Sequence, residues 1–93
     1  MDIILITTDG CEACKIQDNI IKSVLSHVGK SAIMYERLDC KDNKTKEFIH
    51  KHKLIIDDFP ATVILDDDGS FVTKITGTCT ANKFEKIIEC LNK

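Results

Sequence analysis

The sequence contains no tryptophan, one proline and four glycines among its 93 residues. It also has no clear excess of charge, because 13 basic and 15 acidic residues leave a net charge of −2. A nucleic-acid surface, or a surface that binds anionic membranes, needs a basic excess, so we expect neither kind of partner. The 43% of hydrophobic and 30% of charged residues are typical of a folded globular domain.

Long hydrophobic runs are also missing. The run near the N-terminus, Ile3–Ile6, is far shorter than the roughly 20 residues of a membrane helix or the roughly 7–15 of a secretory signal. We therefore expect no membrane segment and a cytoplasmic location. The length suits one compact domain spanning residues 1–93, since domains usually have about 50–250 residues.

Cysteine is the residue type that stands out. The five cysteines are Cys11, Cys14, Cys40, Cys79 and Cys90, an odd number and too few for a scaffold held together by disulfides. In a reducing cytosol, a close pair of cysteines is more often catalytic or metal-binding than structural. The chemistry of the chain therefore depends on the pair Cys11 and Cys14.

The hydrophobic pattern predicts seven secondary-structure elements in the order β-α-β-α-β-β-α. We expect strands at 2–7, 32–39, 61–65 and 70–76, and helices at 12–28, around Phe48 and Ile49, and at 80–91. Strand 61–65 is almost entirely apolar, which is typical of a central strand covered on both faces. The initial β-α-β unit implies two parallel strands, and Asp67-Asp68-Gly69 is a hairpin signal. We therefore expect an α/β fold, with a mixed four-stranded sheet flanked by three helices in a three-layer α/β/α sandwich.

The helices carry further expectations about their ends and buried faces. The expected apolar stripes are Ile16, Ile20, Ile21, Val24, Leu25 and Val28 in the first helix, and Phe84, Ile87, Ile88 and Leu91 in the last. Gly29 is expected to cap the first helix, because glycine readily takes the left-handed conformation needed there. Asp42 or Asn43 is expected to cap the start of the second helix.

The motif Cys11-Glu12-Ala13-Cys14 lies between the first predicted strand and the first predicted helix. At a helix N-terminus, free backbone N–H groups and the positive end of the helix dipole stabilise an anion. We therefore expect Cys11 to point outward and to lose its proton easily. Cys14 follows one turn later, close enough to attack a mixed disulfide formed at Cys11.

A zinc site is the alternative for this pair. Zinc usually needs a second pair of cysteines or histidines at matching spacing, and the chain has neither. His50 and His52 are two positions apart, so on a helix they point to different sides. We therefore expect no metal site and a redox role for Cys11 and Cys14.

Over essentially its whole length, the chain resembles the thioredoxin/glutaredoxin superfamily. Three segments carry the resemblance: the C-x-x-C pair followed by Lys15, the segment Phe59-Pro60-Ala61-Thr62, and Gly77 after the hairpin. The second is similar to the cis-proline loop of the family, and the third to the glycine that leads into its last helix. The resemblance implies the thioredoxin fold and a cis bond between Phe59 and Pro60.

The resemblance also implies a thiol–disulfide oxidoreductase. Cys11 would attack a disulfide in a substrate protein and Cys14 would resolve it, while Phe59, Pro60, Gly77 and Thr78 would bind the substrate chain. The only redox group would be the Cys11–Cys14 disulfide, with no bound cofactor. A thioredoxin reductase-type flavoprotein or glutathione would supply electrons to the monomer. A glutathione-dependent glutaredoxin, and a glutaredoxin-like module that holds an iron–sulfur cluster or metal, are the alternatives.

Several positions depart from the pattern of the family. Gly10 stands where a tryptophan usually precedes the first cysteine, and Leu5 where a buried acid usually assists the second thiol. Glutaredoxins typically have Thr-Val-Pro, which is Asp58-Phe59-Pro60 here. Their Gly-Gly-x-Asp corresponds to Gly77-Thr78-Cys79-Thr80, which lacks the acid. These differences argue against selectivity for glutathione.

Charged residues next to Cys11 are expected to tune its reactivity, namely Asp9, Glu12 and Lys15. The two acids oppose the helix dipole and raise the energy of the thiolate. Because a less stabilised thiolate makes the dithiol easier to oxidise, we predict a reducing protein.

The three remaining cysteines are expected to have lesser roles. We expect Cys40 and Cys90 to be buried or semi-exposed structural residues. For Cys79, which borders the expected substrate groove, both a structural role and a regulatory or glutathionylated thiol remain open.

Overall fold

The computed structural model describes residues 1–28 and 33–91, and its elements follow the expected order. The strands are β1 (Asp2–Thr7), β2 (Met34–Asp39), β3 (Ala61–Leu65) and β4 (Phe71–Thr76), and the helices are α1 (Glu12–Val28), α2 (Asn43–Lys51) and α3 (Ala81–Leu91). Only the starts of β2, β4 and α3 differ from the expected bounds. Ala32, where the second strand was expected to begin, and Gly29, expected as a helix cap, lie outside the described residues.

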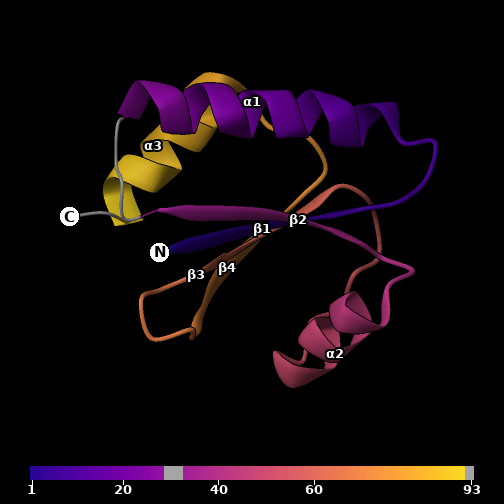
Figure 1. Cartoon of the computed structure of the whole chain (residues 1–93). Helices are drawn as coiled ribbons and strands as arrows, with labels where there is room; N and C mark the ends of the chain where they lie inside the picture. Colours follow the sequence, from indigo (N-terminus) through magenta and orange to yellow (C-terminus); the bar gives the residue numbers. More distant parts are fainter. Residues whose placement is uncertain (29–32, 92–93) are drawn as a thin grey trace.

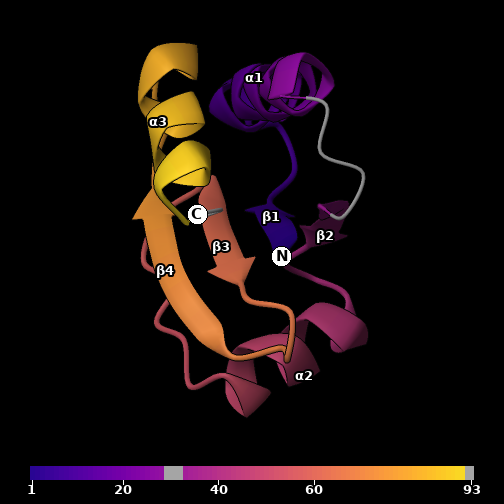
Figure 2. The ribbon, with the colours of Figure 1, turned by 90° about the vertical axis from the view of Figure 1, so that its left-hand side faces the viewer.

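The four strands form one mixed sheet in the order β2-β1-β3-β4. β1 pairs with β2 in parallel and with β3 antiparallel, and β4 pairs antiparallel with β3. Helices α1 and α3 cover one face of this sheet, and α2 covers the other (Figures 1 and 2). The arrangement confirms the predicted three-layer α/β/α sandwich, in which β4 is an edge strand.

Two hydrophobic cores lie on the two faces of the sheet, because successive side chains of a strand point to opposite faces. Ile3 and Leu5 of β1 pack with α1 and α3, whereas Ile4 and Ile6 face α2. All five residues of β3 are buried, as expected for a strand covered on both faces. β1 and β3 therefore form the rigid centre of the sheet, and the ends of both strands support the segments around Cys11.

The buried face of α1 differs from the expected stripe. Ile16 is 53% exposed, whereas the polar residues Gln17 and Asp18 are buried. The face that packs on the sheet is centred on Cys14, Ile21 and Val24, which rotates Ile16 toward solvent. Gln17 and Asp18 can be buried because both have hydrogen-bond partners inside the fold.

The other helices show smaller differences. Leu91 ends α3 and is 37% exposed, so it was wrongly placed in the buried stripe, whereas Phe84 and Ile88 are buried as expected. Asp42 precedes α2 at the expected position, but its side chain makes no capping hydrogen bond. Among the described helices, none is long and apolar enough to cross a membrane.

Candidate active site

Cys11 and Cys14 are joined by a disulfide at the start of α1, and their Cα atoms are 5.2 Å apart. Gly10, which has a φ of +68°, turns the chain from β1 into the helix. Cys11 is partly exposed, whereas Cys14 is only 4% exposed. The two residues therefore have the unequal exposure expected of an attacking and a resolving cysteine.

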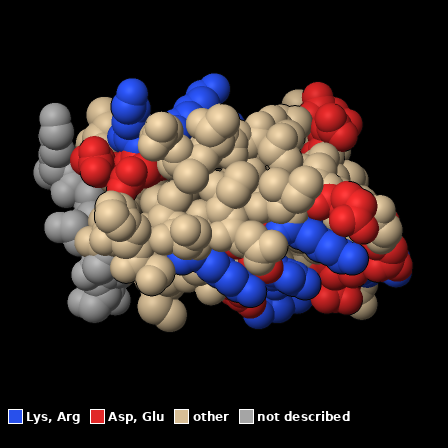
Figure 3. Space-filling view, turned by 90° about the horizontal axis from the view of Figure 1, so that it is seen from above, with Lys and Arg blue, Asp and Glu red and all other residues tan. Residues whose placement is uncertain are grey.

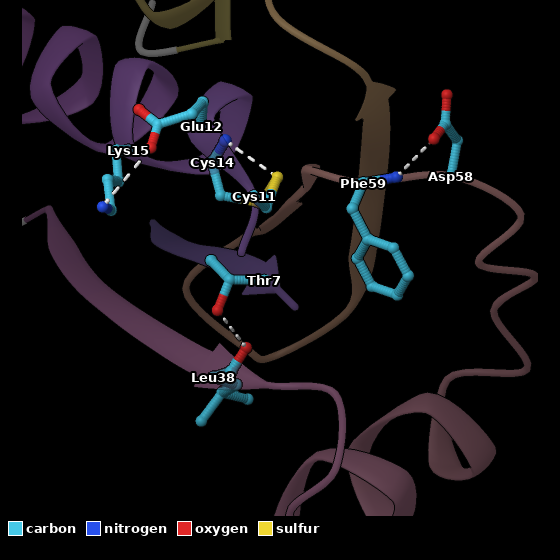
Figure 4. The surroundings of a disulfide bond; sticks show 8 residues. All are labelled: Thr7, Cys11, Glu12, Cys14, Lys15, Leu38, Asp58 and Phe59. Atoms are coloured by element: carbon cyan, nitrogen blue, oxygen red, sulfur yellow. Dashed lines mark hydrogen bonds and ion pairs between the residues drawn. A yellow bond between two sulfur atoms is a disulfide. The ribbon is translucent and has the colours of Figure 1, made fainter. Parts of the chain in front are cut away.

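Cys11 occupies the position that caps the helix. Its carbonyl oxygen accepts a hydrogen bond from the Lys15 N–H at 3.4 Å, and its sulfur accepts one from the Cys14 N–H at 3.0 Å (Figure 4). A serine or aspartate oxygen usually makes this second contact at a helix N-terminus. The same N–H group and the helix dipole would stabilise negative charge on Cys11 in the reduced protein.

The register of the sheet brings three segments to the same end of the sheet. Ile6 of β1 lies opposite Ala61 of β3, so the chain leading to Cys11 lies beside Pro60. Ala61 also lies opposite Thr76 of β4, which places Gly77 at this end. The Gly77 N–H donates to the Pro60 carbonyl at 2.8 Å. The expected site residues Cys11, Cys14, Phe59, Pro60, Gly77 and Thr78 thus gather at one end of the sheet.

The Phe59–Pro60 peptide bond is cis, as the resemblance implies. Phe59 is partly buried, and its ring packs against the core on the α2 side of the sheet. The Phe59 N–H donates to the Asp58 carboxylate at 2.8 Å (Figure 4). The backbone of Phe59 is thus held by an exposed side chain that can move away.

A polar cavity of about 180 Å³ lies on the β2 side of the disulfide. Its lining includes both cysteines together with Thr7, Lys15, Arg37 and Asp39. Gly10 also lines it, so the absence of a large side chain at this position leaves the space open. Arg37 and Asp39 were missed from the sequence, although their alternation along β2 was a signal that they share a face.

Leu5 is fully buried in the core between the sheet and helices α1 and α3, so β1 carries no carboxylate at this position. Its sheet neighbours are Arg37 on β2 and Thr62 on β3. The buried Thr62 hydroxyl has no hydrogen-bond partner within the part of the chain that the structure describes. A buried carboxylate lies instead on α1, at Asp18, one turn beyond Cys14.

Asp18 is held by three donors. The Tyr35 hydroxyl donates to one carboxylate oxygen at 2.6 Å, and Arg37 and Lys22 each approach the other at 3.1 Å. Burial would raise the pKa of Asp18, but the hydrogen bonds from Tyr35, Lys22 and Arg37 outweigh it and lower the pKa below its usual value. Burial and the bond to Asp18 raise the pKa of Tyr35. This network fixes Arg37 beside the polar cavity.

Asp18 is expected to make stability depend on acidity. Because its folded-state pKa is lowered, its contribution is present above the unfolded pKa and is lost as the pH falls below that value and through the folded pKa. Asp18→Asn is expected to lower the free energy of unfolding by about 1–3 kcal/mol at pH 7. It is also expected to make the free energy of unfolding less dependent on pH in the acidic range. Urea unfolding at pH 7 and pH 3 measures both effects. The exposed Glu47→Gln is the control, and an Asp18→Asn profile parallel to that of wild type would contradict the expectation.

Both acids near Cys11 have lysine partners. Asp9 forms an ion pair with Lys41, a residue that the sequence did not single out, and Glu12 lies 3.6 Å from Lys15. The hydrogen bond from Lys41 to Asp9 raises the pKa of that lysine. These exposed pairs offset part of the field that the two acids exert on Cys11.

Substitutions of the Glu12–Lys15 pair are expected to move the redox potential in opposite directions. Glu12→Gln removes a repulsive charge, stabilises the reduced thiolate and raises the potential, whereas Lys15→Gln lowers it, each by roughly 10 mV. Equilibration with glutathione buffers at low salt measures the potentials. Glu36→Gln, which breaks an ion pair with Lys44 on β2 and α2, serves as control. Shifts of the same sign for Glu12→Gln and Lys15→Gln would contradict this electrostatic account.

The other cysteines occupy different environments. Cys40 is partly buried, as expected, but Cys90 is exposed on α3, which contradicts the expectation of a buried or semi-exposed residue. Cys90 lies off the face of the helix that contains Phe84 and Ile88, so it points to solvent. Cys79 is 7% exposed and packs in the core under α1 and α3, which favours its structural role over a regulatory one.

No group of three or more His, Cys, Asp or Glu side chains is arranged to hold a metal ion within residues 1–28 and 33–91. The pair Cys11 and Cys14 therefore has no third side-chain ligand among them. What the site offers chemically is a disulfide between a partly exposed cysteine and a buried one.

Neither a family model nor a curated protein matches the sequence. Among solved structures, thioredoxin-2 of the malaria parasite has a TM-score of 0.76 and 16% identity, over 96% of this chain and 81% of its own. A thioredoxin-like protein from Clostridium perfringens has a TM-score of 0.77 and 23% identity, over 97% and 69%. Mitochondrial thioredoxin 3 of Saccharomyces cerevisiae, in its oxidized form, has a TM-score of 0.72 and 17% identity, over 96% and 76%. The chain therefore has the thioredoxin fold, and its Cys11–Cys14 pair fits a C-x-x-C site.

Proposed function

We propose that the protein is a thiol–disulfide oxidoreductase that reduces disulfides in other proteins, acting as a monomer in the cytoplasm. One observation carries the proposal: a disulfide at a helix N-terminus joins a partly exposed cysteine to a buried one. Thiol–disulfide exchange needs an accessible thiolate and a nearby second thiol that attacks the mixed disulfide. Cys11 and Cys14 fit these two roles.

The reaction transfers two electrons from the reduced pair to the substrate. The Cys11 thiolate attacks one sulfur of the substrate disulfide, forming a mixed disulfide and releasing one substrate thiolate, which takes a proton from water. The Cys14 thiolate then attacks the Cys11 sulfur. The Cys11–Cys14 disulfide forms, and the second substrate thiolate leaves and is protonated.

The second step requires Cys14 to lose its proton although it is buried. Leu5 offers no carboxylate for this purpose, but Cys14 lines the polar cavity together with Arg37 and Asp39. Water in a cavity of this size can accept the proton and pass it to solvent. The positive charge of Arg37, fixed by Asp18, favours the Cys14 thiolate.

The substrate chain is proposed to bind at the sheet edge formed by Phe59, Pro60, Gly77 and Thr78. The Phe59 N–H would pair with the substrate backbone after releasing Asp58. Uncharged surface covers the middle of the face that carries α1 and α3 (Figure 3). On α1, the exposed Ile16 offers an apolar contact two residues after Cys14, which suits a protein substrate better than a small charged one.

Insulin reduction tests this function. With dithiothreitol as electron donor, wild-type protein is expected to accelerate the reduction well above dithiothreitol alone, and no acceleration would contradict the proposal. Replacing dithiothreitol with NADPH and thioredoxin reductase, or with glutathione and its reductase, then identifies the donor. The absence of the glutaredoxin residues at Asp58 and Thr80 favours the reductase.

An iron–sulfur cluster or metal held through Cys11 is the alternative. The absorbance of anaerobically purified protein separates the two functions, because a cluster absorbs visible light and a dithiol does not. We expect a colourless protein.

A further inference from the structure

The buried amide of Gln17 is not used by the proposed chemistry. Gln17 lies one turn beyond Cys14 on α1 and is fully buried. Its amide oxygen accepts the backbone N–H of Cys79 at 2.9 Å, and its amide nitrogen donates to the Cys79 sulfur at 3.5 Å. Both ends of one side chain thus engage a single residue 62 positions away in the sequence.

The Gln17 contact lies at one end of residues 77–79, a segment that contains Gly77 and Thr78 of the proposed substrate-binding surface. β4 ends at Thr76, so the sheet cannot pair the N–H of Cys79. At the other end of the segment, the Gly77 N–H is held by the Pro60 carbonyl at 2.8 Å. Thr78 lies exposed between these two fixed points.

Hydrogen bonds therefore join all three segments around the disulfide. Helix α1 holds Cys79 through Gln17, and Pro60 holds Gly77. A buried N–H group that loses its acceptor is costly, so without Gln17 the backbone at Cys79 would have to move to find another partner. Such a movement would shift Thr78 relative to Cys11.

We propose that Gln17 is a positioning residue that sets the 77–79 backbone at the substrate edge, so that an extended protein substrate binds productively over Cys11. The inference rests on the proposed function. A small disulfide that contacts only the Cys11 sulfur does not need this edge. Gln17 therefore governs selectivity for protein disulfides over small ones, while the intrinsic reactivity of the pair is independent of it.

Gln17→Met tests the proposal, because methionine has a similar length but its thioether sulfur is only a weak acceptor for the Cys79 N–H. The second-order rate constants of the reduced protein are measured with insulin and with 5,5′-dithiobis(2-nitrobenzoate). The ratio of the insulin constant to the small-disulfide constant is expected to fall about 5- to 10-fold, as for loss of one buried hydrogen bond. Cys79→Ala removes the thiol but keeps the backbone N–H, so it is expected to lower the ratio less.

A destabilised control separates positioning from a general loss of stability. Ile88→Val weakens the same core but removes neither hydrogen bond that holds the 77–79 backbone, and it is expected to leave the ratio unchanged. Amide hydrogen exchange gives a readout that does not depend on activity: Gln17→Met is expected to speed exchange at 77–79 more than Ile88→Val does.

Three outcomes would overturn the inference. An unchanged rate ratio in Gln17→Met, or unchanged amide exchange at 77–79 in that variant, would remove it while leaving the proposed function intact. A wild-type protein that reacts with the small disulfide but not with insulin would remove both.

Discussion

Replacing Cys11 with serine is expected to reduce insulin reduction by about 1,000-fold, because the attacking thiolate is lost. Cys14→Ser is expected to stop at a different step of the reaction. Its Cys11 thiolate still attacks, but no second thiol resolves the intermediate, so the protein accumulates as a mixed disulfide with its substrate. Intact-mass analysis after mixing with insulin distinguishes the two variants, since only Cys14→Ser gains the mass of a substrate chain.

Single serine substitutions at Cys40 and Cys90 are the matched controls. Cys40 is partly buried and Cys90 is exposed, and neither lies among the segments that meet at Cys11. Both variants are expected to reduce insulin at the wild-type rate. A mixed disulfide at Cys90 in the Cys14→Ser protein, or a Cys11→Ser protein that remains active, would show that the pair has been assigned wrongly.

Phe84→Ala is expected to be the most destabilising single substitution in the core between the sheet and helices α1 and α3. Phe84 is fully buried and packs with Ile3, Leu5 and Cys79. Removal of a buried phenylalanine ring lowers the free energy of unfolding by about 3–5 kcal/mol. The total free energy of unfolding of a domain of this size is only about 5–14 kcal/mol. We expect the melting temperature to fall by roughly 15–30 °C, since each kcal/mol shifts it by about 4–8 °C.

Phe71→Ala is the control for the same change of side chain. Phe71 lies on the edge strand β4 and is 46% exposed, so its loss is expected to cost about 1 kcal/mol or less. Thermal unfolding followed by circular dichroism compares the two variants. Equal losses of stability would contradict the assignment of Phe84 to the centre of this core.

The fold was predictable from the sequence because its elements have strong local signals. The apolar run 3–6 and the run 61–65, which is apolar except at Thr62, identify the two central strands, and Asp67-Asp68-Gly69 identifies the hairpin between β3 and β4. The position of Cys11 and Cys14 between a strand and a helix followed from the same signals, whereas the position of Pro60 beside them was implied by the family resemblance. Once the strand order is known, the pairing of β1 with β3 places Cys11 beside Pro60.

The polar residues inside the fold could not be predicted in this way. Gln17 and Asp18 look like solvent-facing helix residues, because their partners Cys79, Tyr35 and Arg37 are 17 to 62 positions distant. Periodicity reports which side of a helix is apolar, but not which polar groups find partners across the fold. Because the burial of Gln17 and Asp18 has no local signal, the expected buried face of α1 was centred on its apolar residues and wrongly included Ile16.

The redox equilibrium of the Cys11–Cys14 pair tests the account most directly. The protein is equilibrated in glutathione buffers of known potential, quenched with acid, alkylated, and the Cys11–Cys14 disulfide is quantified by mass spectrometry. We predict one reversible two-electron transition, with a midpoint at or below the glutathione poise of about −220 to −260 mV. A midpoint near the −120 mV or so of a strong oxidant, or no reversible transition between Cys11 and Cys14, would contradict it.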